Sequence, residues 1–538
     1  MTTTRRDFLA ATGASLAAAA GWPTFLPRRA RFDLVLRGGA LLDGTGAAAI
    51  ERDLAITGGR ITAIGRRLAR GVEEIDARGL AVAPGFVDMH SHGDGSLADD
   101  PRAESVIRQG ITTIITGQDG GSRATGAPDR SFTAHFAAID ELRPAINVAS
   151  MVGLGTVRGA VIGDGDRPAT AAEIERMRAL VAAALEQGAC GASSGLEYTP
   201  GAFATPDELA AVAVPLRTRR LPYATHQRNE DDRLLESIAE SIAVARGAGC
   251  PLQISHLKTQ GPRNWGKLDA AFRLIDEARA AGLDVTFDRY PYLAYSTGLT
   301  NLFPVWSRDG GTDAFLARLD DTATAPRIRA DALAKVELIG GWNSVQITSV
   351  RAEEDRAAEG KRLGDLAQAA GTDPYELATG LLRRSSGSVG MVGFAMSEEN
   401  LERILAHPLA MVCTDGGAFA TEGPARRGSP HPRALGSFPR VLGRYVRERR
   451  TLPLEDAIRK MTSLPAARVG LTDRGRLLEG RAADVVVFDP ATIADRATFE
   501  DPFQYPVGFA AIIVNGVVAV RGSEHRAGAG TGRALRPA

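Results

Sequence analysis

Short apolar segments that alternate with polar ones divide the chain into two kinds of region. Residues 32–82 contain brief alternating runs between glycine turns, such as FDLVLRGGALLDG and DLAITGGRITAIG, and residues 475–521 repeat this rhythm. Alternation with period two between such turns predicts β-strands with one buried face. We therefore expect a β-sandwich built from both chain ends, residues 31–84 and 474–522, followed by a tail over 523–538.

Between these regions, residues 85–473 change to apolar runs separated by amphipathic helical patterns, which is typical of βα units in a parallel sheet. The candidate strands are residues 85–92, 112–120, 146–153, 188–198, 221–228, 251–257, 284–292 and 410–417. Eight such units predict an α/β fold of the (β/α)8, TIM-like barrel type. The interval before the last strand is too long for one helix, so we expect a small inserted subdomain over about residues 299–350.

The first thirty residues have the layout of a twin-arginine signal peptide. Arg5 and Arg6 are followed by Phe8 and Leu9 and then by a short Ala-rich apolar region. This region is shorter than the roughly 20 residues that a membrane-spanning helix needs. We expect export by the twin-arginine machinery to the periplasm or the medium, without a membrane anchor.

Charge and cysteine content narrow the function classes. The 64 basic and 64 acidic residues balance, so nothing in the charge indicates nucleic acid or an anionic membrane as a partner. The three cysteines, Cys190, Cys250 and Cys413, are far apart and lie in apolar runs. They predict buried hydrophobic positions rather than disulfides or a zinc knuckle.

Ionisable residues stand at the ends of most predicted barrel strands. They are His90, His92, Asp119, Glu197, His226, His256, Asp288 and Asp415. Active sites of such barrels lie at the carboxyl ends of the strands, so we expect these side chains to converge. His90 and His92 are alternate residues of one strand and can hold one metal ion together. The histidines at 135, 407, 431 and 525 end no strand, and we expect structural roles for them.

These motifs resemble the D-aminoacylase, or N-acyl-D-amino-acid deacylase, family of the amidohydrolase superfamily. The resemblance rests on the segments PGFVDMHSHGD, GITTIITGQDG, GASSGLEYTPGAFATPDEL, YATHQRNE, ISHLKTQG, DVTFDRYPYLAYSTGL, CTDGGAF, HPRALGSFPR and EGRAADVVVFDP, in this order along the chain. It implies a hydrolase that cleaves N-acyl-D-amino acids into a carboxylic acid and a free D-amino acid. It does not indicate an oligomeric state.

The resemblance also implies roles for residues of the site. One or two zinc ions are implied, the tighter one held by His226 and His256 and the second by His90 and His92, with Asp415 as a further ligand and as the catalytic base and acid. Lys258, Tyr290 and Ser296 match positions that contact substrate. Arg433 is a second candidate for binding the substrate carboxylate, and an internal ion pair is an equally good interpretation of it.

Two departures from the family pattern stand out. The family has GNCG where this chain has GQDG, so Asp119 replaces a metal-binding cysteine, and Leu154 replaces a histidine of a GHG motif. A carboxylate is a harder ligand than a thiolate and admits Mn²⁺ or Co²⁺ beside Zn²⁺. Asp119 could instead cap its loop as an Asx turn. We expect Glu197 to bridge or support the metals, because the fourth strand contains no lysine.

Three alternatives use the same scaffold. A cyclic-amide hydrolase of the hydantoinase or dihydroorotase type normally requires a carboxylated lysine in the fourth strand, which is absent. Hydrolysis of dipeptides that contain a D-residue would use the same side chains as the deacylase. A binding protein that has lost catalysis would lack ligands, whereas all four strand-end histidines and Asp415 are present.

Overall fold

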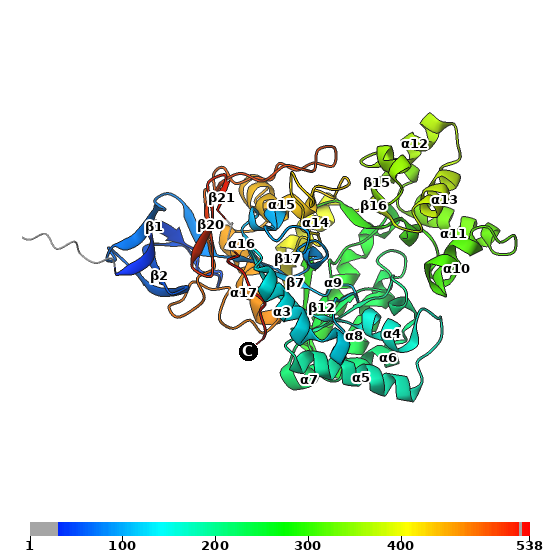
Figure 1. Ribbon diagram of the computed structural model, residues 1–538, viewed down its shortest axis with the longest axis horizontal. Coiled ribbons are helices and arrows are strands. Elements are labelled where there is room, and N and C mark those ends of the chain that lie inside the picture. The colour runs from blue at the N-terminus through cyan, green and yellow to red at the C-terminus, as the bar shows by residue number, and fades with distance from the viewer. Residues whose placement is uncertain (1–30, 527–529, 538) are drawn as a thin grey trace, which may run out of the picture.

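The molecule has three parts arranged in a row (Figure 1). The computed structural model describes residues 31–526 and 530–537. A β-domain lies at one end, a parallel αβ barrel in the middle, and an inserted lobe at the other end. Residues 1–30, which carry the predicted signal peptide, lie outside the described residues. None of the described helices is long and apolar enough to cross a membrane.

The barrel closes through two groups of parallel strands. Its strands are β6 (Phe86–Asp88), β7 (Ile111–Thr116), β8 (Asn147–Ser150) continued by β9 (Val152–Gly153), β10 (Ala192–Gly195), β11 (Tyr223–His226), β12 (Leu252–Ile254), β13 (Val285–Arg289) and β17 (Ala410–Val412). A parallel bridge between Ser91 and Gly416 joins the first strand to the last. The described residues thus form the predicted eight-stranded (β/α)8 barrel.

Helices cover the outside of the barrel and pack against its strands to form the main core. They include α3 (Phe132–Leu142), α5 (Ala171–Glu186), α6 (Pro206–Ala213), α8 (Leu234–Ala248), α9 (Leu268–Ala280), α14 (Glu398–Ala406) and α16 (Leu454–Met461). Local sequence signals mark where some of these helices begin and end. Thr170 and Glu173 form a capping box at the start of α5, and Gly249 ends α8 in the left-handed conformation. Between these helices and strands such as the fully buried Ile111–Thr116, apolar side chains pack into one continuous core.

The β-domain draws strands from both ends of the chain, as expected. From the N-terminal side come β1 (Phe32–Leu41), β2 (Ile50–Thr57), β3 (Arg60–Gly65), β4 (Gly71–Asp76) and β5 (Ala81–Pro84), and from the C-terminal side β18 (Val485–Phe488), β19 (Phe509–Val514), β20 (Val517–Arg521) and β21 (Glu524–His525). In the described residues they form one nine-stranded sheet, joined where β5 pairs with β18. The sheet curls so that Ile61 hydrogen-bonds to Arg481, around its own apolar core.

The C-terminal tail is part of the barrel floor rather than a free extension. Arg533 and Leu535 hydrogen-bond to Val148 of β8 on either side of a parallel bridge at Ala534. The Leu535 side chain is buried among apolar residues inside the barrel, such as Met89 and Met411. Such long-range pairing carries no periodic signal in the sequence.

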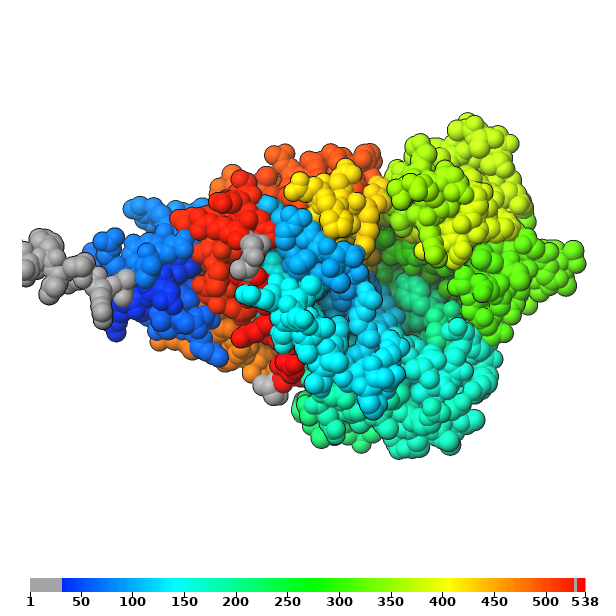
Figure 2. Space-filling model, viewed as in Figure 1, coloured from blue at the N-terminus to red at the C-terminus, as the bar shows by residue number. Residues whose placement is uncertain are grey.

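The inserted lobe is about twice as long as predicted. It runs from β14 (Ala294–Gly298) to β16 (Val389–Phe394), which pair with each other, and it includes β15 (Val345–Val350), α10 (Gly311–Arg318), α11 (Ala325–Leu338), α12 (Leu363–Ala370) and α13 (Pro374–Arg384). The expected boundary near residue 350 was wrong, because α12, α13 and β16 have the same periodicities as a barrel βα unit. Figure 2 shows the surface hollowed between this yellow-green lobe and the cyan helices of the barrel.

Candidate active site at the barrel mouth

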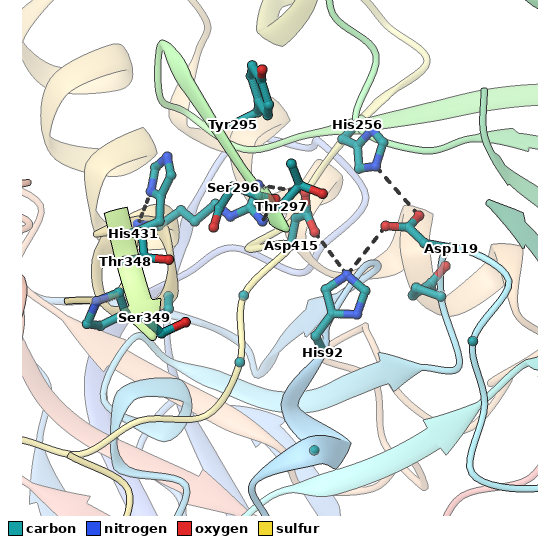
Figure 3. Close-up of a pocket in the computed structure, with 18 of the residues that line it drawn as sticks. His92, Asp119, His256, Tyr295, Ser296, Thr297, Thr348, Ser349, Asp415 and His431 are labelled. Atoms are coloured by element: carbon teal, nitrogen blue, oxygen red, sulfur yellow. Dashed lines mark hydrogen bonds and ion pairs between the residues drawn. The ribbon is translucent and has the colours of Figure 1, made fainter. Parts of the chain in front are cut away.

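A cavity of about 1140 Å³ opens at the carboxyl ends of the barrel strands. Barrel residues line its inner part, and the inserted lobe contributes Tyr295, Ser296, Thr297 and Thr348–Val350 (Figure 3). All seven predicted metal-binding side chains come together at its inner end. His90 itself lies fully buried just behind the lining.

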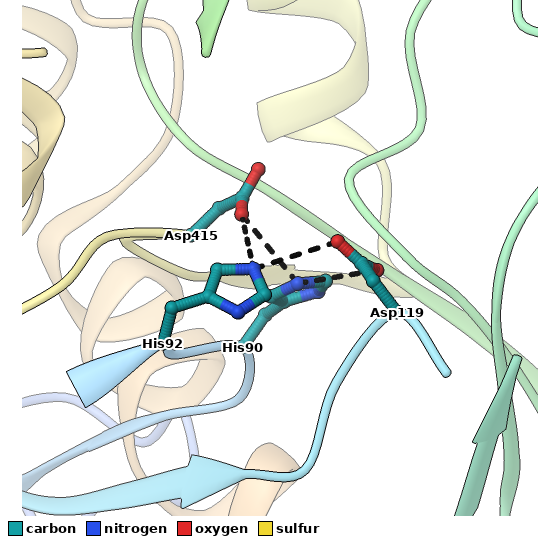
Figure 4. Close-up of side chains that lie close together, drawn as sticks. All are labelled: His90, His92, Asp119 and Asp415. Carbon is teal, nitrogen blue, oxygen red and sulfur yellow. Dashed lines mark ion pairs between the residues drawn. The ribbon is translucent and has the colours of Figure 1, made fainter. Parts of the chain in front are cut away.

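Asp119 stands at the centre of this cluster, in contact with all four histidines. Its carboxylate oxygens lie 3.4 Å from His90 Nε2 and 3.5 Å from His92 Nε2 (Figure 4). They also lie 3.8 Å from His226 Nδ1 and 3.6 Å from His256 Nε2. Its side chain does not cap its own loop through a hydrogen bond, so the structure favours the ligand interpretation over an Asx turn.

Left-handed backbone conformations aim three of these side chains into the cavity. Asp119, His256 and Asp415 have φ angles of 51°, 34° and 49°, which are uncommon for non-glycine residues and concentrate at functional sites. Asp288 stabilises one of them, because its Oδ1 accepts the His256 backbone N–H at 2.9 Å. The same oxygen lies 3.7 Å from His90 Nδ1, so Asp288 supports two of the histidines.

The histidines share a pattern in which one ring nitrogen faces the cluster and the other faces outward. The outward nitrogen of His226 lies 3.5 Å from Glu197 Oε2, and that of His256 lies 3.1 Å from Glu230 Oε1. Carboxylates that accept the remote N–H of metal-bound histidines fix the tautomer and the ring orientation. Glu197 therefore supports His226 from outside, and this geometry does not make it the predicted bridge between metals.

Asp415 joins the cluster to a buried arginine. Its Oδ1 lies 3.1 Å from His92 Nε2, and its Oδ2 accepts a hydrogen bond from Arg433 Nη1 at 2.7 Å. Burial alone would raise the pKa of Asp415, but the Arg433 charge and the nearby histidines hold it well below the usual range. Arg433 also donates to the Ser296 carbonyl, so the structure places it in an internal ion pair.

The same carboxylates act on the histidines in return. Burial lowers the pKa of His92, but Asp119 and Asp415 outweigh it and raise that pKa to about 10. Burial likewise opposes the charge of His226, yet the Glu230 charge together with Asp119 and Glu197 raises its pKa to about 10. The carboxylates of the cluster thus stabilise positive charge at the inner end of the cavity.

The cluster fits a metal centre by its unsatisfied donors. Among the described residues, three buried atoms of the cluster have no hydrogen-bond partner: both ring nitrogens of His90 and Oδ1 of Asp119. Buried polar atoms are ordinarily paired, so these three atoms fit the role of ligands to a bound cation. Ligand atoms of His90, His92, Asp119 and Asp415 lie within 4.8 Å of one another, as do those of Asp119, His226 and His256. Imidazole and carboxylate donors suit Zn²⁺ and also Mn²⁺ or Co²⁺.

The predicted substrate contacts line the same cavity as this centre. The cavity is lined by Lys258, Tyr290, Ser296 and Arg433. Tyr290 is fully buried and its hydroxyl has no hydrogen-bond partner among the described residues. Leu154 begins α4 (Leu154–Ile162) and is buried, so this position supplies packing where the family has a histidine.

Several neighbours were missed from the sequence. They are Glu230, Gln260, Tyr198, Tyr295 and Asn301, all of which line the cavity. Glu230 follows His226 by four residues in the loop after β11, and polar loops after barrel strands were the signal that could have revealed it. Asn301 donates to Glu197 Oε2 at 2.9 Å from the inserted lobe, a contact that no local pattern indicates. Of the other histidines, His431 donates to the Ala294 carbonyl, and His525 lies 2.7 Å from a Glu104 carboxylate oxygen.

Comparisons with known proteins agree with this site. Residues 73–520 match the amidohydrolase family. The chain is 37% identical over 504 residues to an N-acyl-D-glutamate deacylase and 38% identical over 506 residues to an N-acyl-D-aspartate deacylase, both from Alcaligenes xylosoxydans xylosoxydans. These alignments cover 90% of this chain and 93% and 92% of the relatives.

A solved structure gives the same result in three dimensions. N-acyl-D-glutamate deacylase from Bordetella bronchiseptica, complexed with zinc and a phosphonate that mimics the tetrahedral intermediate, superposes with a TM-score of 0.80. It is 37% identical, and the match covers 94% of this chain and 99% of that one. This chain therefore belongs to the amidohydrolase family.

Proposed function

We propose that the protein hydrolyses the amide bond of N-acyl-D-amino acids and releases a carboxylate and a free D-amino acid. The observation that carries the proposal is the Asp119 carboxylate in contact with four histidines, beside the buried Asp415–Arg433 pair. The relatives named as deacylases over nearly the full chain support it.

One or two zinc ions would be held by His226, His256 and Asp119, and by His90, His92, Asp119 and Asp415. Such a metal supplies Lewis acidity toward the amide carbonyl and makes water nucleophilic at neutral pH. The remaining chemistry belongs to the side chains around it.

Asp415 is placed to take the proton from the attacking water and to deliver it to the leaving nitrogen. Its lowered pKa keeps it ionised at neutral pH, as a proton acceptor must be. The hydrogen bond from Arg433 holds one carboxylate oxygen, which leaves the other directed at the cluster. Arg433 acts in this proposal through Asp415.

Lys258 is the cation for the substrate carboxylate, and Tyr290 and Ser296 line the same cavity. Lys258 is 3% exposed and lines the cavity, so a carboxylate that reached it would be largely shielded from water. The unpartnered Tyr290 hydroxyl can donate a hydrogen bond to the carbonyl oxygen as negative charge develops on it.

A dipeptide with a D-residue is the second candidate substrate. At about 1140 Å³ the cavity exceeds the roughly 300–1,000 Å³ that is usual for small ligands. The same ligands, base and lysine would serve this reaction.

We also propose export through the twin-arginine pathway, supported by Arg5, Arg6, Phe8 and Leu9. Cell fractionation of the full chain beside an Arg5→Lys, Arg6→Lys variant tests it. Retention of the variant inside the cell is expected, and equal export of both chains would contradict it.

The experiment for the catalytic proposal combines metal analysis with paired substrates. Purified protein is stripped with a chelator, reloaded with Zn²⁺, Mn²⁺ or Co²⁺, and assayed for amino acid release from N-acetyl-D and N-acetyl-L forms of the same residues. We expect bound metal and chelator-sensitive, D-selective release. Bound metal without release from any pair, dipeptides included, would overturn the proposed substrate class.

A further inference from the structure

Glu230 contacts both His256, a proposed metal ligand, and Lys258, the proposed partner of the substrate carboxylate. It is 1% exposed and stands in the loop after β11. Its Oε1 accepts a hydrogen bond from Lys258 Nζ at 2.5 Å and lies 3.1 Å from His256 Nδ1. Its Oε2 accepts from Gln260 Nε2 at 2.8 Å, and its backbone carbonyl accepts the Gln260 N–H. The three side-chain contacts hold the carboxylate in one orientation, and the fourth fixes the backbone of the loop.

His256 Nδ1 has two candidate partners that make opposite demands on it. Lys258 Nζ lies 2.6 Å away and can only donate to this nitrogen, whereas Glu230 can only accept from it. His256 Nε2 faces Asp119, and a metal ligand must present a lone pair there. Only the tautomer with the proton on Nδ1 does so, and Glu230 is the group that holds this proton.

The tautomer of His256 also determines which N–H groups of Lys258 are free to donate to a substrate. Once Nδ1 carries a proton, Lys258 cannot donate to it, and the N–H so released becomes available to a substrate carboxylate. The remaining hydrogen bond to Glu230 keeps the ammonium group beside the cavity. We propose that Glu230 is a positioning residue that fixes the metal-binding tautomer of His256 and anchors Lys258 for the substrate carboxylate. The Lys258 half of this inference rests on the proposed deacylase function.

The test compares Glu230→Gln with two control variants. Zinc affinity is measured by competition with a chromophoric chelator, without substrate, and KM and kcat are measured with an N-acetyl-D-amino acid. Lys258→Gln removes the cation alone. Asp232→Asn removes a half-exposed carboxylate from the same loop, where it pairs with Arg263.

For Glu230→Gln we expect zinc affinity to fall by about tenfold or more, as for other carboxylates behind metal-binding histidines, together with a higher KM. Lys258→Gln should raise KM while zinc affinity stays within about twofold of the parent. The double variant should have the KM of Lys258→Gln, because Glu230 acts on substrate through the lysine. Asp232→Asn should change neither quantity.

Thermal unfolding of the metal-free proteins controls for a folding defect, and Glu230→Asp, which keeps the charge, should recover part of the zinc affinity. Unchanged zinc affinity in Glu230→Gln, or an equal loss in Asp232→Asn, would overturn the His256 half. A KM that rises further in the double variant would overturn the Lys258 half. If the parent releases no amino acid at all, the proposed function and the Lys258 half fall together, while zinc affinity still decides the His256 half.

Discussion

The two halves of the donor cluster, on either side of Asp119, are built differently. His226 and His256 are buried, and each turns its outer nitrogen to a buried carboxylate, Glu197 or Glu230. On the other side, the His92 side chain is 42% exposed, and neither ring nitrogen of His90 has a hydrogen-bond partner among the described residues. Second-layer carboxylates hold ligands in place before the metal arrives. We therefore expect the His226–His256 half to bind metal more tightly, and the other half to serve the chemistry beside Asp415.

The inserted lobe contacts a supporting carboxylate of the first half directly, and it reaches the second half through the Ser296 carbonyl, which accepts a hydrogen bond from Arg433. Asn301 donates to Glu197. Burial alone would raise the pKa of Glu197, but the charge of Lys335 in α11 together with His226 lowers it to about 2. Within the barrel, the other half is supported by Asp288 and by Arg433 on Asp415. Substitutions on the two sides should therefore have different consequences.

The largest effect is expected on the chemical side. Asp415→Asn should lower kcat by about 10³-fold, within the range for loss of a general base, while the ion bound by His226 and His256 remains. Steady-state kinetics and metal content of one preparation check both statements. Asp99→Asn, which removes a half-exposed carboxylate paired with Arg427, is the control. If Asp415→Asn kept its activity within tenfold of the parent, Asp415 would not be the general base.

A comparison of one ligand from each half comes next in size. His256→Ala should weaken the tightest metal site by more than about 100-fold, because loss of a ligand costs at least as much as loss of its supporting carboxylate. His92→Ala should leave the tightest affinity within about threefold and lower kcat instead. Chelator competition measures both affinities. Equal losses in the two variants would show that the halves do not differ in affinity.

The sequence predicted the ligands better than their supports, for a physical reason. His226 ends an apolar strand, and His90, His256 and Asp415 each follow one within three residues. The barrel rule places strand ends together, so a local pattern sufficed. Asn301 reaches Glu197 across 104 residues, and β14 pairs with β16 across the lobe. Those contacts depend on how the lobe folds back, which neither periodicity nor turn chemistry encodes.

Proton competition should be visible as a pH dependence of metal binding. The pKa of His92 and that of His226 are both raised to about 10 by their carboxylate neighbours, against about 6.5 in an unfolded chain. A metal must displace these protons, so zinc affinity should rise by about tenfold per pH unit for each proton displaced. Chelator competition from pH 6.5 to 9 measures the slope, and a flat profile would contradict it.

The same raised pKa values set the sign of a stability change. Protonated His92 and His226 stabilise the metal-free fold fully below about pH 6.5, and this contribution is lost as pH rises toward 10. The metal-free protein should therefore melt at lower temperatures as pH rises through this window, and the loaded protein should not follow it. If the melting temperatures of the metal-free and the loaded protein changed with pH in the same way, these histidines would not be charged in the metal-free fold.

The smallest expected effect concerns Asp119, the residue that both halves share. Asp119→Cys replaces two carboxylate oxygens by one softer sulfur, so the ratio of zinc to manganese affinity should rise several-fold. Asp119→Asn keeps the size but removes the charge, and it should weaken all metals in both halves, because this carboxylate contacts all four histidines. Reconstitution with zinc and manganese in competition separates the cases. If neither variant changes the metal content or the ratio, the cluster binds metal without Asp119, and the two halves are independent sites rather than one centre joined by a carboxylate.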